Sequence, residues 1–375
     1  MADVPMPQAE RAGWRLPRMR RLVASRGFQK WAARNPFTRR IVRAEGEAMF
    51  DLVAGFCHSQ ILQALVLFDV PGRLMAGPAH VDVLARQVGV PPERMRVLMR
   101  AGVALGLLKR RRDDRYALSR RGAALAGVPG LQDMIRHHAV LYRDLADPVA
   151  FFRGDSDPAL AGFWPYVFGG DVDPQEAARY SDLMAESQLL VADDTLDAVS
   201  LKGVSRLMDV GGGSGAFLTQ VGARYPGLAL TLFDLPAVAP QAEARFANAG
   251  LSERATILSG SFRTDVLPEG ADAISLIRVL YDHTDETVEL LLQRCFAALP
   301  VGGRLIISEP MRGGKQAERA GDAYFALYTL AMGTGKARSA DEIALLCRNA
   351  GFGQVRLPAA RRPFITSCVT AIREK

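Results

Sequence analysis

The stretch Asp209-Val210-Gly211-Gly212-Gly213-Ser214-Gly215 decides the fold of the second half of this 375-residue chain. It follows an apolar run that starts at Arg206, and a segment with helical spacing opens after it at Ala216. Glycines in such a turn let the backbone approach a ligand closely, and the N-terminus of the next helix offers unpaired N–H groups. The stretch therefore predicts a strand, a ligand-binding turn and a helix.

Short β-rich runs alternate with helical segments from residue 201 to the end of the sequence. The expected strands are Arg206–Val210, Ala229–Phe233, Ala255–Leu258, Ala273–Ile277, Arg304–Ser308, Gln354–Leu357 and Thr366–Ile372. This alternation predicts an α/β fold with a Rossmann-like parallel sheet covered by helices on both faces. Ligands bind such sheets at the carboxyl ends of the strands, so Asp234, Ser261, Phe262 and the run Arg278–His283 become candidate site residues.

The spacing of the glycines separates several kinds of nucleotide site. A nicotinamide enzyme prefers G-x-G-x-x-G, but the sixth position counted from Gly211 is Ala216. A phosphate-binding loop needs a Gly-Lys-Ser/Thr ending, which is missing. The pattern Asp-x-Gly-x-Gly-x-Gly is typical of S-adenosylmethionine methyltransferases, with the leading Asp209 near the charged amino-acid end of the cofactor. A glycine turn with a purely structural role is the remaining alternative.

The first half of the chain predicts a winged helix. Apolar residues recur at helical spacing from Ala48 to Phe68, and a helix over Val81–Val88, a second helix after Pro91-Pro92 and a hairpin around Asp113-Asp114 follow. Winged helices commonly bind DNA, and the basic run Lys109–Arg112 would suit phosphates, so a DNA-binding regulator is the competing function of another class. The long remainder with its glycine turn argues against that function.

Length, composition and charge set the domain organisation. We expect a basic amphipathic arm over residues 1–43, a winged-helix domain over 44–128, a helical linker that contributes to the acceptor pocket over 129–200, and the cofactor-binding domain over 201–375. Arginines crowd the arm and alternate with aromatic residues such as Trp14 and Trp31. Such an arm either lies on an anionic membrane surface or is solvated and partly disordered.

Other features of the sequence restrict location and chemistry. We expect no membrane-spanning run, because the apolar stretches are short, and no secretory signal, which predicts a cytoplasmic protein. The 4 cysteines are far apart and the 5 histidines lack metal-ligand spacing. They predict buried reduced thiols, no disulfide framework and no metal.

With these motifs in this order, the chain from about Phe50 onward resembles the small-molecule O-methyltransferases that join a winged-helix dimerisation domain to a class I catalytic domain. The resemblance implies S-adenosylmethionine as methyl donor, S-adenosylhomocysteine as product, a homodimer and no nucleic-acid partner. It also implies that Gly211, Gly213 and Asp234 hold the methionine and ribose parts, and that Ser261 and Phe262 border adenine. Ser261 stands where the family commonly has Asp. Arg278 would lie beside the cofactor.

For the residues that act on the acceptor, the resemblance offers alternatives. Many relatives read His-Asp-Trp where this chain reads Tyr281-Asp282-His283. Either Tyr281 orients the acceptor hydroxyl or His283 takes its proton, unless both only cap the strand. Glu309 would polarise a base or the acceptor, or would cap a turn. Met184 would touch acceptor or cofactor, or would be a core residue.

A closer resemblance concerns the acceptor. The run Phe50–Phe56, the pair Ser59-Gln60, the run Arg278–His283 and the basic N-terminus are similar to the carotenoid O-methyltransferases of purple phototrophic bacteria. These enzymes methylate the tertiary 1-hydroxyl of acyclic carotenoids of the demethylspheroidene and hydroxyneurosporene type. A membrane-dissolved acceptor implies peripheral contact of the basic arm with the cytoplasmic membrane. A bacteriochlorophyllide-ring, phenolic or polyketide methyltransferase remains an alternative, as does a protein that binds the cofactor without catalysis.

Overall fold

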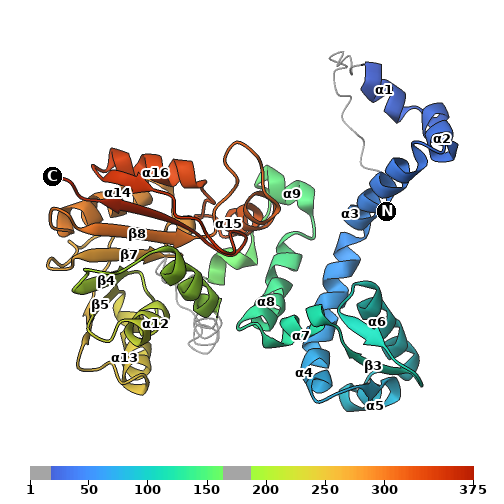
Figure 1. Cartoon of the computed structure of the whole chain (residues 1–375), viewed down its shortest axis with the longest axis horizontal. Coiled ribbons are helices and arrows are strands. Elements are labelled where there is room, and N and C mark those ends of the chain that lie inside the picture. The colour runs from blue at the N-terminus through green and yellow to red at the C-terminus, as the bar shows by residue number, and fades with distance from the viewer. Residues whose placement is uncertain (1–17, 164–186) are drawn as a thin grey trace. The chain divides into compact units, whose positions relative to one another are not determined.

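The computed structural model describes residues 18–163 and 187–375 (Figure 1). Internal contacts divide the chain into two compact units. Among the described residues, the first holds 18–70 and 78–117, and the second holds 71–77, 118–163 and 187–375.

The first unit contains the predicted winged helix. Its elements are α1 (Arg18–Ala24), α2 (Arg26–Arg34), α3 (Arg39–Leu67), β1 (Ala79–His80), α5 (Val81–Val88), α6 (Pro92–Ala104), β2 (Leu108–Arg110) and β3 (Arg115–Leu118), with a small sheet in the order β1-β3-β2. Helix α5 ends at Gly89, where φ is +68°, a conformation that glycine adopts without strain. Val81, Leu84, Met95 and Met99 are fully buried between α5 and α6. This arrangement confirms the fold expected for the first half, including the wing at β2 and β3.

Helix α3 corrects two expectations from the sequence. It is 29 residues long and begins at Arg39, so it extends into the segment expected to be an arm. By length and hydropathy alone it qualifies as a membrane span, with a mean hydropathy of 1.4 over its most apolar window, of which 17% is buried. The expectation that every apolar run is too short to span a membrane was wrong, because the helix continues from Ile61 back to Arg39. Cys57 on this helix is exposed, whereas the other three cysteines are buried.

The second unit opens with helices and continues into the large sheet. The helices are α4 (Val70–Met75), α7 (Arg120–Gly127), α8 (Leu131–Asp144), α9 (Pro148–Arg153), η1 (Ala159–Phe163) and helical residues 187–198. The strands are β4 (Arg206–Val210), β5 (Ala229–Asp234), β6 (Ala255–Ser259), β7 (Ala273–Ile277), β8 (Arg304–Glu309), β9 (Gly353–Arg356) and β10 (Ser367–Ile372).

These strands form one sheet in the order β6-β5-β4-β7-β8-β10-β9. The first five are parallel to one another, and β10 pairs antiparallel with both β8 and β9. The predicted parallel sheet is thus confirmed for β4 to β8, while the final pair adds an antiparallel edge. The strand order reverses between β4 and β7, and in open α/β sheets the ligand crevice lies at such a point.

Helices cover both faces of the sheet, as Figure 1 shows. One apolar core lies between the sheet, α14 (Asp285–Ala298) and α16 (Ala340–Asn349), with Ile274, Leu291 and Cys347 among its buried residues. The other joins α12 (Ala216–Arg224), α13 (Ala239–Asn248) and residues 191–201 to the opposite face. The remaining elements, η2 (Pro236–Val238), η3 (Leu280–Asp282), η4 (Arg319–Phe325) and α15 (Ala326–Ala331), follow the carboxyl ends of strands or continue from them.

Candidate active site

The glycine turn lies between β4 and α12, as the sequence predicts. Gly211 and Gly213 have φ values of +70° and +57°, in the left-handed region where residues with a Cβ are strained. A Cβ on Gly211 would lie 3.1 Å from the side chain of Val279, whereas one on Gly213 would meet nothing within 4 Å. The Gly211 N–H donates to the carbonyl of Phe233 (2.9 Å), which fixes the turn to the neighbouring strand. The turn therefore keeps an open backbone surface at Gly213.

Asp209 lies beneath this turn. Its carboxylate is fully buried, Oδ1 accepts a hydrogen bond from Ser275 Oγ (2.5 Å), and a Cβ on Gly212 would come within 2.3 Å of Oδ2. No described residue gives Oδ2 a hydrogen-bond partner. Burial raises the pKa of Asp209 to about 7, against the effect of the Ser275 hydroxyl. An acid with an unused oxygen directly below the glycine turn is an incomplete polar group, of the kind that a bound ligand or water completes.

Asp234 ends β5 and connects two parts of the turn region. Its Oδ2 accepts from the Gly213 N–H (2.6 Å) and its Oδ1 from the Leu235 N–H (2.7 Å). Burial raises the pKa of this carboxyl, although both N–H groups oppose the effect. The carboxylate is therefore oriented by backbone groups at the carboxyl end of the strand, where an acid takes ribose hydroxyls in doubly wound folds.

Ser261 and Phe262 follow β6 in the same region. The Phe262 ring lies 3.9 Å from the position of a Cβ on Gly211, which places it against the turn. The Ser261 hydroxyl accepts from the Arg263 N–H (3.3 Å). The Phe262 ring thus lies against the glycine turn, consistent with a ring-binding surface.

Arg278 follows β7 and has a φ of +59°, which is unusual for a residue with a side chain. Its guanidinium donates to Ser187 Oγ (2.8 Å) and to the Tyr281 hydroxyl (3.2 Å), and its N–H donates to the Ser308 carbonyl (2.8 Å). Strained backbone of this kind is found where surrounding contacts hold a residue for function. Arg278 therefore ties the helical residues 187–198 to the turn that carries Tyr281.

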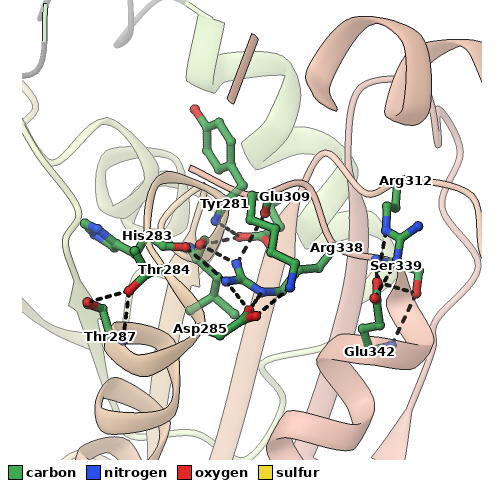
Figure 2. Close-up of polar contacts among 12 residues, drawn as sticks. Tyr281, His283, Thr284, Asp285, Thr287, Glu309, Arg312, Arg338, Ser339 and Glu342 are labelled. Carbon is green, nitrogen blue, oxygen red and sulfur yellow. Dashed lines mark hydrogen bonds and ion pairs between the residues drawn. The ribbon is translucent and has the colours of Figure 1, made fainter. Parts of the chain in front are cut away.

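Glu309 and Arg338 hold that turn, η3, from two sides (Figure 2). Oε2 of Glu309, at the end of β8, accepts from the N–H groups of Leu280 (3.0 Å) and Tyr281 (3.2 Å). Arg338 donates to the carbonyls of Leu280 (2.8 Å) and His283 (3.0 Å). Burial raises the pKa of Glu309 to about 7, and Arg338 lowers it in part. Glu309 thus serves as a backbone acceptor in this structure, which is closer to the turn-capping alternative than to polarisation of an acceptor.

Arg338 is itself only 1% exposed and needs a counterion. Asp285, at the start of α14, supplies it with contacts of 2.9 and 2.7 Å and also pairs with Lys336 (2.5 Å). Figure 2 shows this cluster below η3, with the Tyr281 ring directed away from it. Arg338 was not among the site residues predicted from the sequence. The sequence shows only an arginine in a loop of small and polar residues, and this pattern does not indicate a site unless the arginine is known to be buried.

Tyr281 and His283 point in different directions (Figure 2). The Tyr281 hydroxyl meets Arg278, and burial raises the pKa of Tyr281 well above its usual value. The His283 ring packs edge-on against Phe262 (5.3 Å between centroids), and its Nδ1 lies 3.2 Å from Arg263. Burial lowers the pKa of His283 to about 4, assisted by Arg263 and Arg338. Of the two candidates, His283 is therefore on the side of Phe262 and Tyr281 on the side of Arg278. Met184 lies outside the described residues.

Two of the histidines that lack metal-ligand spacing, His137 and His138, contact tyrosines whose pKa values the charge of Arg278 lowers in part. His137 Nε2 lies 2.9 Å from the Tyr328 hydroxyl, and His138 Nε2 lies 2.6 Å from the Tyr324 hydroxyl. Adjacent histidines on a helix and two tyrosines four residues apart were a signal for such pairing. Within residues 18–163 and 187–375, no group of three or more His, Cys, Asp and Glu side chains gathers as metal ligands.

A glycine turn with an oriented acid on the next strand defines a nucleoside-binding α/β enzyme, and comparison with known proteins gives its family. The O-methyltransferase domain profile matches residues 142–353, and the O-methyltransferase dimerisation domain profile matches residues 50–127. The first match covers more than half of the chain, which therefore belongs to the O-methyltransferase family. The protein is an S-adenosylmethionine-dependent O-methyltransferase. Its dimerisation domain supports a homodimer.

Individual relatives cover nearly the whole chain. The chain is 57% identical over 355 residues to demethylspheroidene O-methyltransferase of Cereibacter sphaeroides, covering 94% of both chains. It is 52% identical to the demethylspheroidene O-methyltransferase of Rhodobacter capsulatus, covering 94% of this chain and 88% of the relative. Human N-acetylserotonin methyltransferase, solved with its methyl donor, shares the fold at a TM-score of 0.74 and 24% identity, covering 88% of this chain and 98% of that one.

Proposed function

We propose that this enzyme methylates the tertiary 1-hydroxyl of an acyclic hydroxycarotenoid of the demethylspheroidene type, in carotenoid biosynthesis. The single observation that carries the acceptor is the 57% identity over 94% of both chains to a demethylspheroidene O-methyltransferase. One feature of the site agrees with this acceptor: Tyr281 stands where many relatives have a histidine base. A tertiary alcohol is too weak an acid to be ionised before it reacts, so a tyrosine that orients its oxygen suits it.

The residues at the carboxyl ends of β4 and β5 fit S-adenosylmethionine. Gly211 and Gly213 have backbone conformations in which a Cβ would be strained, and Asp209 has an oxygen without a partner among the described residues. Asp234 accepts hydrogen bonds from the N–H groups of Gly213 and Leu235. We assign the methionine and ribose parts to Gly211, Gly213 and Asp234, with Asp209 supporting the turn from below. We assign the adenine to Ser261 and Phe262. When bound, the cofactor supplies an electrophilic methyl group on a sulfonium.

The contribution of the chain to methyl transfer is then mostly placement. Aligning an oxygen with a reactive methyl can supply several kcal/mol, roughly 7 to 11 in well-oriented systems. Tyr281 is suited to this task, because its N–H donates to Glu309 and its hydroxyl accepts from Arg278. Arg338 also holds the carbonyl of the preceding Leu280. His283 packs on Phe262 instead, and we assign it to the cofactor side of the site.

Purified enzyme with the methyl donor tests the acceptor. We expect conversion of a 1-hydroxy carotenoid in detergent or liposomes to its methyl ether, with equimolar S-adenosylhomocysteine. Bacteriochlorophyllide and a polyketide phenol are the matched alternatives. Turnover of either, with none on the carotenoid, would contradict the acceptor and leave the family assignment intact. Binding of the cofactor without turnover of any of the three would favour a non-catalytic protein.

We also propose that the N-terminal helices dock a cytoplasmic enzyme on an anionic membrane leaflet. Exposed apolar side chains accompany the arginines of α1, α2 and the start of α3: Trp31 is 55% exposed, Phe37 91% and Ile41 63%. The basic residues nearby include Arg20, Arg21, Arg26, Lys30, Arg34, Arg39 and Arg40. Each basic residue near such a surface contributes about 1 kcal/mol of attraction. An acceptor dissolved in membrane gives this surface its purpose.

A further inference from the structure

A histidine and a tyrosine from different elements are joined by a hydrogen bond, and the charge of Arg278 lowers the pKa of the tyrosine in part. His138 lies on α8, and Tyr324 lies in η4, a π-helical segment over Arg319–Phe325 that continues into α15. His138 Nε2 and the Tyr324 hydroxyl are 2.6 Å apart, and their rings meet edge-on at 5.5 Å. Single π-helical turns are rare and are found frequently at functional sites.

The adjacent pair, His137 and Tyr328, provides a contrast within the same elements. Its Nε2 to hydroxyl distance is 2.9 Å. Tyr328 is 5% exposed and belongs to the apolar core formed with Val140 and Leu160. Tyr324 is half-buried and is not part of the described apolar cores. The pair at Tyr328 is therefore packed into an apolar core, whereas Tyr324 keeps part of its surface exposed to solvent.

We propose that Tyr324 and His138 form a proton-relay pair, in which Tyr324 faces the acceptor hydroxyl and His138 receives the proton that methylation releases. This inference rests on the proposed O-methylation. It gives the enzyme a proton acceptor although neither Tyr281 nor His283 is placed to be one. Tyr281 has its hydroxyl on Arg278, and His283 lies against Phe262 and Arg263.

The step balances as follows. The acceptor oxygen forms a bond to the methyl carbon as the carbon–sulfur bond breaks, and the sulfur keeps the electron pair of that bond. The acceptor O–H bond breaks with its electron pair left on the ether oxygen. Its proton passes to Tyr324 Oη, whose own proton passes to His138 Nε2 and later to water. This direction requires the tautomer of His138 with its proton on Nδ1.

The surroundings keep both groups in the required protonation states. Burial lowers the pKa of His138, so that the imidazole is neutral and able to accept, and burial raises the pKa of Tyr324 to about 12, so that the phenol keeps its proton at rest. The charged and titratable groups that face the pair are His137 and Tyr142 on α8, Tyr328 on α15 and Arg278 after β7.

The test compares His138→Ala with His137→Ala, and Tyr324→Phe with Tyr328→Phe. General-base removal typically lowers rates by a factor of about 100 to 10,000. We expect at least a 100-fold fall in kcat for His138→Ala, partial rescue by added imidazole, and an unchanged Kd for S-adenosylhomocysteine. The fall of kcat at acidic pH should disappear in His138→Ala. His137→Ala and Tyr328→Phe should lose stability instead, without imidazole rescue.

Equal losses for both histidines, or no rescue and no change in the pH profile, would overturn the relay. Nuclear magnetic resonance of labelled histidine gives a readout without turnover. A neutral His138 at pH 6 with its proton on Nδ1 supports the relay, and a protonated ring contradicts it. If wild type methylates a phenol and not the carotenoid, the acceptor proposal fails, and the same variants test the relay on that phenol.

Discussion

Glu309 holds Tyr281 through the main chain: its Oε2 accepts from the Tyr281 N–H at 3.2 Å, while its second oxygen has no described partner. A carboxylate at the end of β8 thereby fixes a residue that follows β7, at the point where the acceptor is expected. Because β7 and β8 are paired in a fixed register, this contact fixes the position of the Tyr281 backbone relative to both strands.

Glu309→Ala should lower both stability and kcat. The substitution leaves the N–H groups of Leu280 and Tyr281 without their acceptor, and each unsatisfied buried group costs about 1 to 3 kcal/mol. Glu309→Gln keeps an acceptor oxygen in place and should lose much less. Urea denaturation and steady-state kinetics measure both variants. Equal stability of Ala, Gln and wild type would show that η3 does not depend on Glu309.

Gly213→Ala should weaken binding of S-adenosylhomocysteine about tenfold or more. The alanine adopts φ near +57°, at a cost of about 1 to 2 kcal/mol, and its methyl group enters the surface that we assign to the cofactor. Gly203→Ala is the matched control, because its φ is +82° and its Cβ would also meet nothing within 4 Å. Calorimetry should find a similar stability loss in both variants and weaker ligand binding in Gly213→Ala alone. Unchanged affinity would remove the turn from the cofactor site.

Asp209→Asn should gain stability relative to wild type as the pH rises. Burial raises the pKa of Asp209 to about 7, so the folded state favours the protonated acid. The resulting stability is fully present below the unfolded pKa of about 4 and is lost as the pH rises toward 7. The pKa of His283 is lowered to about 4, so this residue makes stability rise with pH over part of this range. Both proteins contain His283, so its effect cancels in the difference between them. Urea denaturation from pH 4.5 to 7.5 measures the difference, and a pH-independent difference would refute the raised pKa.

Tyr281→Phe should slow methyl transfer roughly tenfold while the Kd of S-adenosylhomocysteine stays constant. The change removes the hydroxyl that accepts from Arg278, and a hydrogen bond to a charged group is worth about 1.5 to 3 kcal/mol. Single-turnover kinetics separate this effect from product release. An unchanged rate would exclude the Tyr281 hydroxyl from acceptor placement.

Phe37→Ser should weaken association with vesicles that contain anionic phospholipid. Phe37 is 91% exposed between α2 and α3, beside basic residues. Val266→Ser, which changes a residue 85% exposed in the second unit, is the control. Co-sedimentation should weaken with salt, because the attraction is partly electrostatic. Equal behaviour of the two variants, or binding to neutral vesicles that is just as strong, would contradict docking through this surface.

The positions of β4 and β7 could be predicted to the residue, because alternating composition and glycine punctuation act locally along the chain. The places of Gly211, Gly213 and Asp234 followed from that, since they adjoin strand ends. Contacts between segments far apart in the chain could not be predicted from the sequence. Arg338 reaches η3 from a loop more than fifty residues away, and His138 meets Tyr324 across 186 positions. Such pairs depend on how helices pack over the sheet, which no local pattern encodes.

The same reasoning explains the errors about the length of α3 and the burial of Cys57. The hydropathy of α3 was judged around Ile61, whereas the helix extends back to Arg39 and exposes most of its apolar window. Cys57 was expected to be buried like the other thiols, but it lies on an exposed part of that helix. Exposure on a helix depends on what covers it, and the dimerisation domain profile spans this segment.

The enclosed position of β10 has a consequence for biosynthesis. Ser367–Ile372 pair with β8 on one side and β9 on the other, so one edge of β8 stays open on the ribosome until these last strand residues have been made. An open, apolar strand edge is a template for wrong pairing between nascent chains. Ribosomes stalled before residue 367 should therefore yield a chain that chaperones retain, however complete its glycine turn is.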